Sequence, residues 1–184
     1  PADVVMTLHK LARIYENKME DPGSAFLVHQ RVISEDPDET QSMVECLRLA
    51  QLTGDWTGLA QAWEQTVPQM EDEHQKVDYL MQLGAIVRDK LDRPEASMAH
   101  FRAVTRHQSD HVPALQALVE LTTLMEQWPA LIETLEQLVE ASPDYQERTR
   151  LAARVGDIYE KHLSNQEEAI EAYVEALSLG CDKV

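Results

Sequence analysis

The sequence contains one grouping of side chains that could hold a metal ion, His107-Gln108-Ser109-Asp110-His111, with His100 one helical stretch earlier. Imidazole nitrogens and a carboxylate are ligands that zinc accepts in a tetrahedral site. On a continuous helix His107 and His111 would share one face. However, Ser109 and Asp110 between them indicate a break in the helix, where polar residues are common. We therefore expect histidines in a solvated loop, and no metal site.

No other pattern predicts catalysis or cofactor binding. The sequence has no Gly-rich phosphate loop, no Ser/His/Asp motif and no HExxH helix. Its 33 acidic residues make paired carboxylates frequent by number alone. The acidic clusters at 35–36, 38–39 and 71–73 precede expected helices, where carboxylates cap the chain and complement the helix dipole. We expect a non-catalytic protein with no cofactor.

Charge and composition narrow the class of partner. The 16 basic and 33 acidic residues of this 184-residue chain give a formal net charge of −17. Such a charge repels phosphate backbones and anionic lipid, so we expect neither nucleic acid nor a membrane surface as partner. No apolar run approaches the roughly 18 residues of a membrane span. Cys46 and Cys181 form no zinc or redox motif, and we expect reduced thiols in a cytoplasmic protein.

Apolar residues recur at helical spacing along the whole chain, and Gly and Pro separate the segments. This pattern predicts ten helices and no strand, with Ser24 capping the second helix and Gly180 ending the last one. The expected helices cover residues 4–19, 24–34, 40–52, 56–67, 73–91, 94–107, 112–127, 128–141, 145–163 and 166–179.

The helical segments repeat with a period of 72 residues. The run Leu83-Gly84-Ala85-Ile86-Val87 lies 72 positions after Leu11-Ala12-Arg13-Ile14-Tyr15 and 72 before Val155-Gly156-Asp157-Ile158-Tyr159. Trp56 and Trp128 keep the same spacing. Their identical places in the repeat favour packing between helices over a role in stacking on nucleic-acid bases.

Each 72-residue repeat divides into two helix pairs of 36 residues. Leu47 lies 36 positions after Leu11 and 36 before Leu83, so alternating pairs form the longer repeat. We expect the pairs at residues 4–37, 39–70, 73–109, 112–143 and 145–180, in a single array over residues 1–184. The chain opens without Met, and the expected terminal helices are as apolar as internal ones. These features predict a fragment of a longer repeat protein whose ends associate with one another.

The helix pairs resemble the tetratricopeptide repeat, whose pattern is Leu-Gly, Tyr three residues later, a turn, then Ala, an aromatic residue, Ala and Pro. The fifth pair matches at Val155-Gly156, Tyr159, Ala169, Tyr173 and Ala176, without the Pro. The third has Leu83-Gly84 and Phe101, with Ser97 at the first Ala, and the first has Ala12, Tyr15, Ala25 and Pro37, with His29 at the aromatic position. The resemblance covers essentially the whole chain. It implies an all-α fold, an α-solenoid of five antiparallel helix pairs in a right-handed superhelix.

The resemblance also implies that the first helices of the pairs line a concave groove for a protein or peptide. The residues expected to contact a partner there are His9, Arg13, Asn17, Arg48, Gln51, Asp78, Arg88, Asp89, Gln116, Glu120, Arg150, Asp157 and Lys161. The best-known groove of the family clamps C-terminal carboxylates with a Lys, Asn, Asn, Lys, Arg set, which this chain lacks. We expect an interaction scaffold. Two alternatives remain open: a passive spacer or self-assembling segment, and a regulatory arm of a larger protein.

Overall fold

The computed structural model describes residues 2–181. Over this range the chain forms ten α-helices, one short 3-10 helix and no strand, which confirms the predicted all-helical class. The chain divides into two compact units, Pro1–Ser97 and Met98–Val184, and the division falls within α6. None of the helices in the described part of the chain is long and apolar enough to cross a bilayer.

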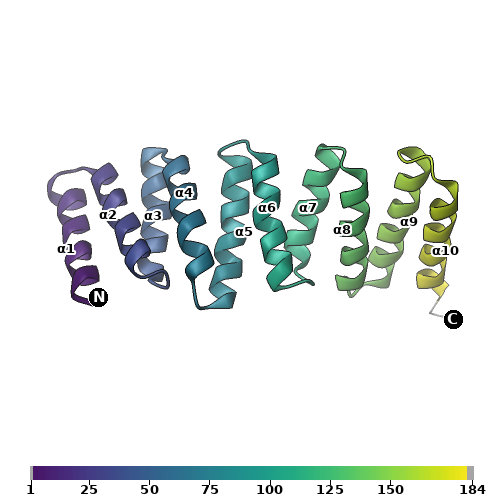
Figure 1. The fold of residues 1–184 in the computed structure, drawn as a ribbon, viewed down its shortest axis with the longest axis horizontal. Helices are drawn as coiled ribbons and strands as arrows, with labels where there is room; N and C mark the ends of the chain where they lie inside the picture. The colour runs from purple at the N-terminus through teal and green to yellow at the C-terminus, as the bar shows by residue number, and fades with distance from the viewer. Residues whose placement is uncertain (1, 182–184) are drawn as a thin grey trace. The chain divides into compact units, whose positions relative to one another are not determined.

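Unit 1 contains the first pairs of helices, and neighbouring helices pack side by side (Figure 1). Its elements are α1 (Ala2–Lys18), α2 (Pro22–Glu35), α3 (Thr40–Thr53), α4 (Trp56–Thr66), η1 (Val67–Gln69), α5 (Glu73–Asp89) and the start of α6 (Pro94–His107). Helix α1 packs on α2, α2 packs on both α3 and α4, and α4 packs on α5.

Unit 2 contains the rest of α6 and the remaining helices. These are α7 (Val112–Leu124), α8 (Trp128–Ala141), α9 (Tyr145–Lys161) and α10 (Gln166–Cys181). Here α7 packs on α8, α8 on α9, and α9 on α10. One apolar core joins α8 and α9 through Leu131, Leu135, Val155 and Ile158.

The structure differs from the sequence-based prediction at two helix ends. Asp21, not Ser24, caps α2: its Oδ1 accepts the Ser24 N–H at 2.9 Å. The helix begins at Pro22 because a proline loses nothing in the first turn, where its missing N–H would be unpaired anyway. Gly180 lies inside α10, which continues to Cys181, so its predicted role as a C-cap is wrong. A glycine ends a helix only where the backbone turns left-handed.

The 72-residue period is also a period of backbone geometry. Helices α1, α5 and α9 each have 17 residues. Each is followed by a non-glycine residue with positive φ, namely Glu20 (52°), Asp92 (51°) and Ser164 (53°). The shorter α3 and α7 are followed by positive φ at Gly54 (80°) and Glu126 (54°). The period read from side chains therefore holds for the turns as well.

Trp56 and Trp128 have equivalent surroundings, as the period predicts. Lys90, the C-cap of α5, places Nζ 5.2 Å from the centroid of the Trp56 ring. His162, the C-cap of α9, stacks on Trp128 with centroids 3.7 Å apart and 18° between the planes. Lys90 and His162 are themselves 72 positions apart. Each indole thus packs against the end of the first helix of the following pair.

The small residues of the repeat lie where two helices of a pair approach closely. A Cβ atom at Gly156 would lie only 2.6 Å from Cε1 of Tyr173, so α9 and α10 leave room for glycine alone. In the third pair, Ser97 Oγ donates a hydrogen bond to the buried Gly84 carbonyl oxygen at 2.8 Å. These contacts place both glycines at the interface between the two helices of their pair.

Candidate partner-binding groove

Residues of α1 and α3 in unit 1 line two adjoining hollows of about 260 and 660 Å³. The hollows share His9, Arg13 and Gln41, so they form one continuous surface, which we call the α1–α3 groove. Its lining consists of Val5, Met6, His9, Lys10, Arg13, Glu16, Asn17, His29, Glu35, Asp36, Gln41, Glu45 and Arg48.

Arg48 holds the two walls of the groove together. Its Nε donates to Glu45 Oε2 on the same helix at 2.8 Å, and its Nη2 donates to Glu16 Oε1 of α1 at 2.7 Å. The hydrogen bond that Arg48 donates to Glu45, and then the one that it donates to Glu16, raise the pKa of the Arg48 guanidinium. These ion pairs are partly exposed, so they add little to stability. Their effect is to fix the positions of both carboxylates along the groove.

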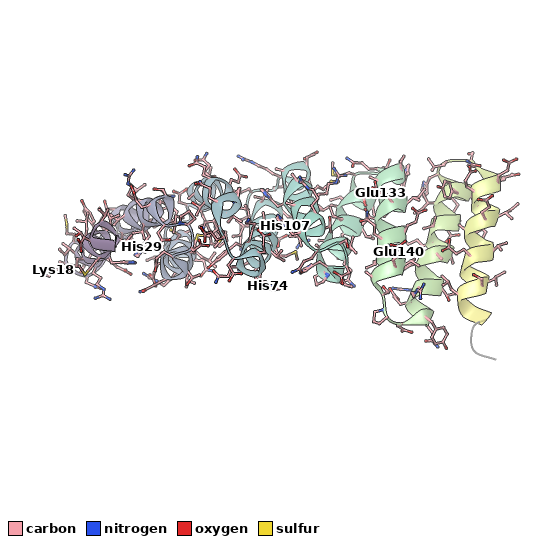
Figure 2. The ribbon with its side chains drawn as sticks, turned by 60° about the horizontal axis from the view of Figure 1, so that its bottom comes forward. Lys18, His29, His74, His107, Glu133 and Glu140 are labelled. Carbon is pink, nitrogen blue, oxygen red and sulfur yellow. The ribbon has the colours of Figure 1, made fainter. Side chains whose placement is uncertain are left out.

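His29 of α2 (labelled in Figure 2) lines the groove between α1 and α3, and we call it the floor of the groove. Its side chain is buried, its Nδ1 lies 3.0 Å from Ser42 Oγ, and its ring meets the His9 ring edge-on with centroids 5.8 Å apart. Burial is the main cause that lowers the pKa of His29; Glu45, Glu39 and Glu16 oppose the shift, while His9 adds to it. The floor is therefore a neutral imidazole at neutral pH.

Glu39 links the His9 wall of the groove to the start of α3. Its Oε2 accepts the N–H of Ser42 at 2.7 Å and so caps α3. The same oxygen lies 3.8 Å from Nε2 of His9. The cap of α3, the His29 floor and the His9 wall of the groove thus belong to three neighbouring helices, α3, α2 and α1.

Three polar side chains of the groove, Arg13, Asn17 and Gln41, are exposed and make no hydrogen bond or ion pair with the residues that the structure describes. The guanidinium presents a planar fork of donors suited to a carboxylate or a carbonyl oxygen. The two carboxamides can both donate to and accept from a peptide backbone. The groove thus offers hydrogen-bonding groups that the fold itself does not use.

The charges of the groove nearly balance, although the chain as a whole is acidic. Lys10, Arg13 and Arg48 carry three positive charges, and Glu16, Glu35, Asp36 and Glu45 carry four negative ones. Val5 and Met6 add apolar surface at one end. A partner segment would therefore meet charged groups of both signs along the groove and apolar side chains at one end.

The other predicted residues of unit 1 lie outside this groove. Gln51 is exposed on α3, and Asp78 is exposed on α5. Arg88 and Asp89, near the end of α5, pair with each other through Arg88 Nε and Asp89 Oδ1 at 2.7 Å. The structure therefore brings His9, Arg13, Asn17 and Arg48 together but not these four.

The predicted residues of unit 2 lie on α7 and α9. Gln116 and Glu120 are exposed on α7. On α9, Arg150 Nη2 donates to Glu147 Oε1 at 2.6 Å, and Lys161 Nζ donates to Asp157 Oδ1 at 2.9 Å. The two helices are linked by a residue that the prediction omitted, Arg154, whose Nη2 donates to Thr123 Oγ1 at 3.0 Å.

One feature of the sequence points to His29, which is not among the residues predicted to contact a partner. His29 stands 72 positions before Phe101 and 144 before Tyr173, so it occupies the aromatic position of the repeat. A polar ring at a position filled elsewhere by apolar rings indicates polar neighbours. Glu45 was missed for another reason, because only the folded structure shows that Arg48 holds it in the groove.

The histidine loop has a structural use. His107 is the last residue of α6, and His111 caps α7, because its Nδ1 accepts the N–H of Ala114 at 3.2 Å. Glu39 has the same role 72 positions earlier, at the start of α3. The predicted break between the two histidines is present. Within residues 2–181, no three His, Cys, Asp or Glu side chains are grouped so that they could hold a metal.

Two further hollows lie between second helices in unit 2. One of about 560 Å³ has Arg102 and Arg106 on α6 facing Glu133 and Glu140, which project from the same side of α8 (Figure 2). The other, of about 340 Å³, is lined by five glutamates from α8 and α10. Burial, followed by the charge of Glu175, raises the pKa of Glu136 there. Crowded carboxylates make this second hollow less suited to an acidic partner than the α1–α3 groove.

The paired helices, their 36-residue spacing and the aromatic ring packed over a small residue define the fold class, a tetratricopeptide-like helical repeat. Solved structures share it. The chain is similar to MamA (TM-score 0.52, 15% identity, 97% of this chain and 93% of that chain). It is similar to the TPR-like repeats of a putative kinesin light chain of Podosopora anserina (0.51, 16%, 97% and 97%). It is also similar to YrrB, described as a TPR protein with an unusual peptide-binding site (0.50, 14%, 95% and 85%).

These likenesses rest on the backbone, since few residues are identical, and they show the fold alone. No family model and no curated protein matches the chain.

Proposed function

We propose that the chain is a non-catalytic scaffold that binds a protein or peptide partner in the α1–α3 groove. The observation that carries this proposal is the set of unpaired polar side chains, Arg13, Asn17 and Gln41, beside walls that Arg48 holds in place. Side chains with no structural partner, held on rigid helices, are suited to recognition.

In this proposal, Arg13 binds a carboxylate or carbonyl oxygen of the partner. Asn17 and Gln41 bind its backbone amides, and Val5 and Met6 receive an apolar side chain at the other end of the groove. The remaining predicted residues are proposed as partner contacts on each unit by itself: Gln51, Asp78, Arg88 and Asp89 on unit 1, and Gln116, Glu120, Arg150, Asp157 and Lys161 on unit 2. The peptide-binding site named for YrrB agrees with such a role in a protein of this fold.

A cytoplasmic location belongs to the same proposal. Burial raises the pKa of the Cys46 thiol to about 12, so this free cysteine stays protonated and unreactive at neutral pH. A reduced, inert thiol fits a reducing compartment.

Site-specific photo-crosslinking tests the groove. A photoreactive residue replaces Gln41 in the groove or, as a matched control, Gln61, which is exposed on α4 and lines a different hollow. We expect a crosslinked partner from cell extract at position 41 and not at 61. Purified partner should then bind the Arg13→Gln/Asn17→Ala variant about tenfold or more weakly, and should bind the control Arg93→Gln, at an exposed position outside the groove, with unchanged affinity. Equal crosslinking at both positions, or unchanged binding to the groove variant, would contradict the proposal.

A further inference from the structure

Helix α10 presents an apolar stripe that no described element covers. Ile170, Val174 and Leu177 follow one another at i, i+4 and i+7, and their side chains are 63%, 59% and 69% exposed. Two equivalent positions on α2 are buried instead. Phe26 and Ile33, 144 positions before Ile170 and Leu177, are 2% and 0% exposed where α2 packs on α3 and α4.

Helix α1 presents a second apolar stripe on the side away from the groove. Val4, Leu11 and Ile14 are 50%, 38% and 43% exposed. On α9, Val155 and Ile158 occupy the places of Leu11 and Ile14, 144 positions later. They are 5% and 4% exposed because they join the core formed with α8. Both stripes thus correspond to surfaces that the fold buries elsewhere.

The two stripes have complementary charges beside them. Glu167, Glu171 and Glu175 form an i, i+4, i+8 row next to the stripe of α10. Lys18 continues the stripe of α1 and projects into solvent (Figure 2). Within the described residues, none of these four side chains forms an ion pair. A second α10 would repel this acidic row, whereas a basic-edged helix would be attracted to it.

The junctions inside the units show how the stripes would meet. At α2–α3 and at α8–α9, the second helix of one pair packs against the first helix of the next. These neighbours are antiparallel, because a short connection joins the end of one to the start of the other. In the same arrangement α10 would place Ile170 near Ile14, Val174 near Leu11 and Leu177 near Val4 of another copy. Glu167 would then lie opposite Lys18.

We propose that the α10 stripe of one copy of this chain docks on the α1 stripe of a second copy, in the manner of an internal junction. The occupant of both faces is the chain itself. The contact is heterologous, since different faces meet, so each dimer keeps one free face of each kind and assembly continues head to tail. This contact uses a side of α1 other than the α1–α3 groove, and it does not depend on what the groove binds.

A mixing experiment with two blocked chains tests the heterologous contact. Val174→Asp blocks the α10 face, and Leu11→Asp blocks the α1 face; both side chains are exposed, so the fold should persist, which circular dichroism verifies. In sedimentation over a wide concentration range, we expect wild type to form a series of growing species. Each variant alone should be monomeric, and the equimolar mixture should stop at a dimer joined through its two intact faces.

A charge exchange provides an independent test. Lys18→Glu and Glu167→Lys should each weaken association about tenfold, and the two together in one chain should restore it. A strictly monomeric wild-type chain would overturn the proposal. The two apolar stripes would then be surfaces for further repeats or for another protein. Dimers of either blocked variant alone would overturn it too, because they require like faces to meet. Failure of the double charge variant to recover would equally refute the antiparallel pairing of Glu167 with Lys18.

Discussion

Replacing Gly156 with alanine is the smallest change that tests how α9 and α10 pack. The new Cβ atom would lie 2.6 Å from Cε1 and 2.7 Å from Cδ1 of Tyr173, closer than real Cβ atoms approach a neighbour. The ring must therefore move away from α9. The movement affects the phenol as well, because the single hydroxyl proton of Tyr173 is shared between Asp157 Oδ1, 2.9 Å from Oη, and Glu160 Oε2, 3.0 Å from Oη.

The expected cost follows from two contributions. Overpacking a tight contact costs about 1–3 kcal/mol. The better helix propensity of alanine returns about 1 kcal/mol. We therefore expect Gly156→Ala to lower the free energy of unfolding by up to about 2 kcal/mol.

Two measurements check this reasoning together. Urea unfolding gives the loss of stability, and a spectroscopic titration, compared with Tyr173→Phe, gives the pKa of Tyr173. In the wild type, the hydrogen bond to Asp157 is the main cause that raises this pKa, so displacement of the ring should bring it back towards the usual value of about 10. Gly23→Ala is the matched control, because its Cβ atom would lie at an ordinary 3.5 Å from Asp21 Oδ1. Unchanged stability together with an unchanged pKa in Gly156→Ala would refute the close crossing.

Two further predictions concern histidines. Burial lowers the pKa of His29 in the folded chain, so its contribution to stability is present above the unfolded value of about 6.5 and is lost as pH falls below it. His29→Phe, which copies Phe101, should reduce the loss of urea stability between about pH 7.5 and 5.5, and an equal loss in both proteins would contradict this. His111→Ala should lower stability by about 0.5–1 kcal/mol through the lost cap of α7, whereas His107→Ala should cost less in the same melts. Zinc should leave the wild-type melting temperature unchanged, and a rise that His107→Ala/His111→Ala abolishes would instead show a metal site.

The helices and their period could be predicted because both depend on local patterns. Apolar spacing marks each helix, and landmarks such as Trp56 and Trp128 recur without gaps. The errors at Ser24 and Gly180 arose because a cap depends on backbone geometry that residue type only suggests. Any of several polar residues near Pro22 could have capped α2, and Asp21 does so.

The groove was predictable only in part. Register in the repeat placed Arg13 and Arg48 on the first helices of their pairs, and both line the groove. The ion pair of Arg48 with Glu16 joins residues 32 positions apart and has no sequence signal of its own. The division of the chain within α6 also depends on the distribution of contacts, which periodicity alone does not reveal.

The recurrence of one left-handed turn has a consequence for how such a chain can evolve. Glu20, Asp92 and Ser164 adopt nearly the same φ. In all three turns, the N–H of the next residue donates to a carbonyl oxygen six positions back, at Tyr15, Val87 and Tyr159. A gene segment that encodes 72 residues could therefore be duplicated or deleted between any two of these turns, and the rejoined chain would meet a turn of unchanged geometry. Recombination at these points could lengthen or shorten the protein in whole modules, without new mutations to rebuild a connection.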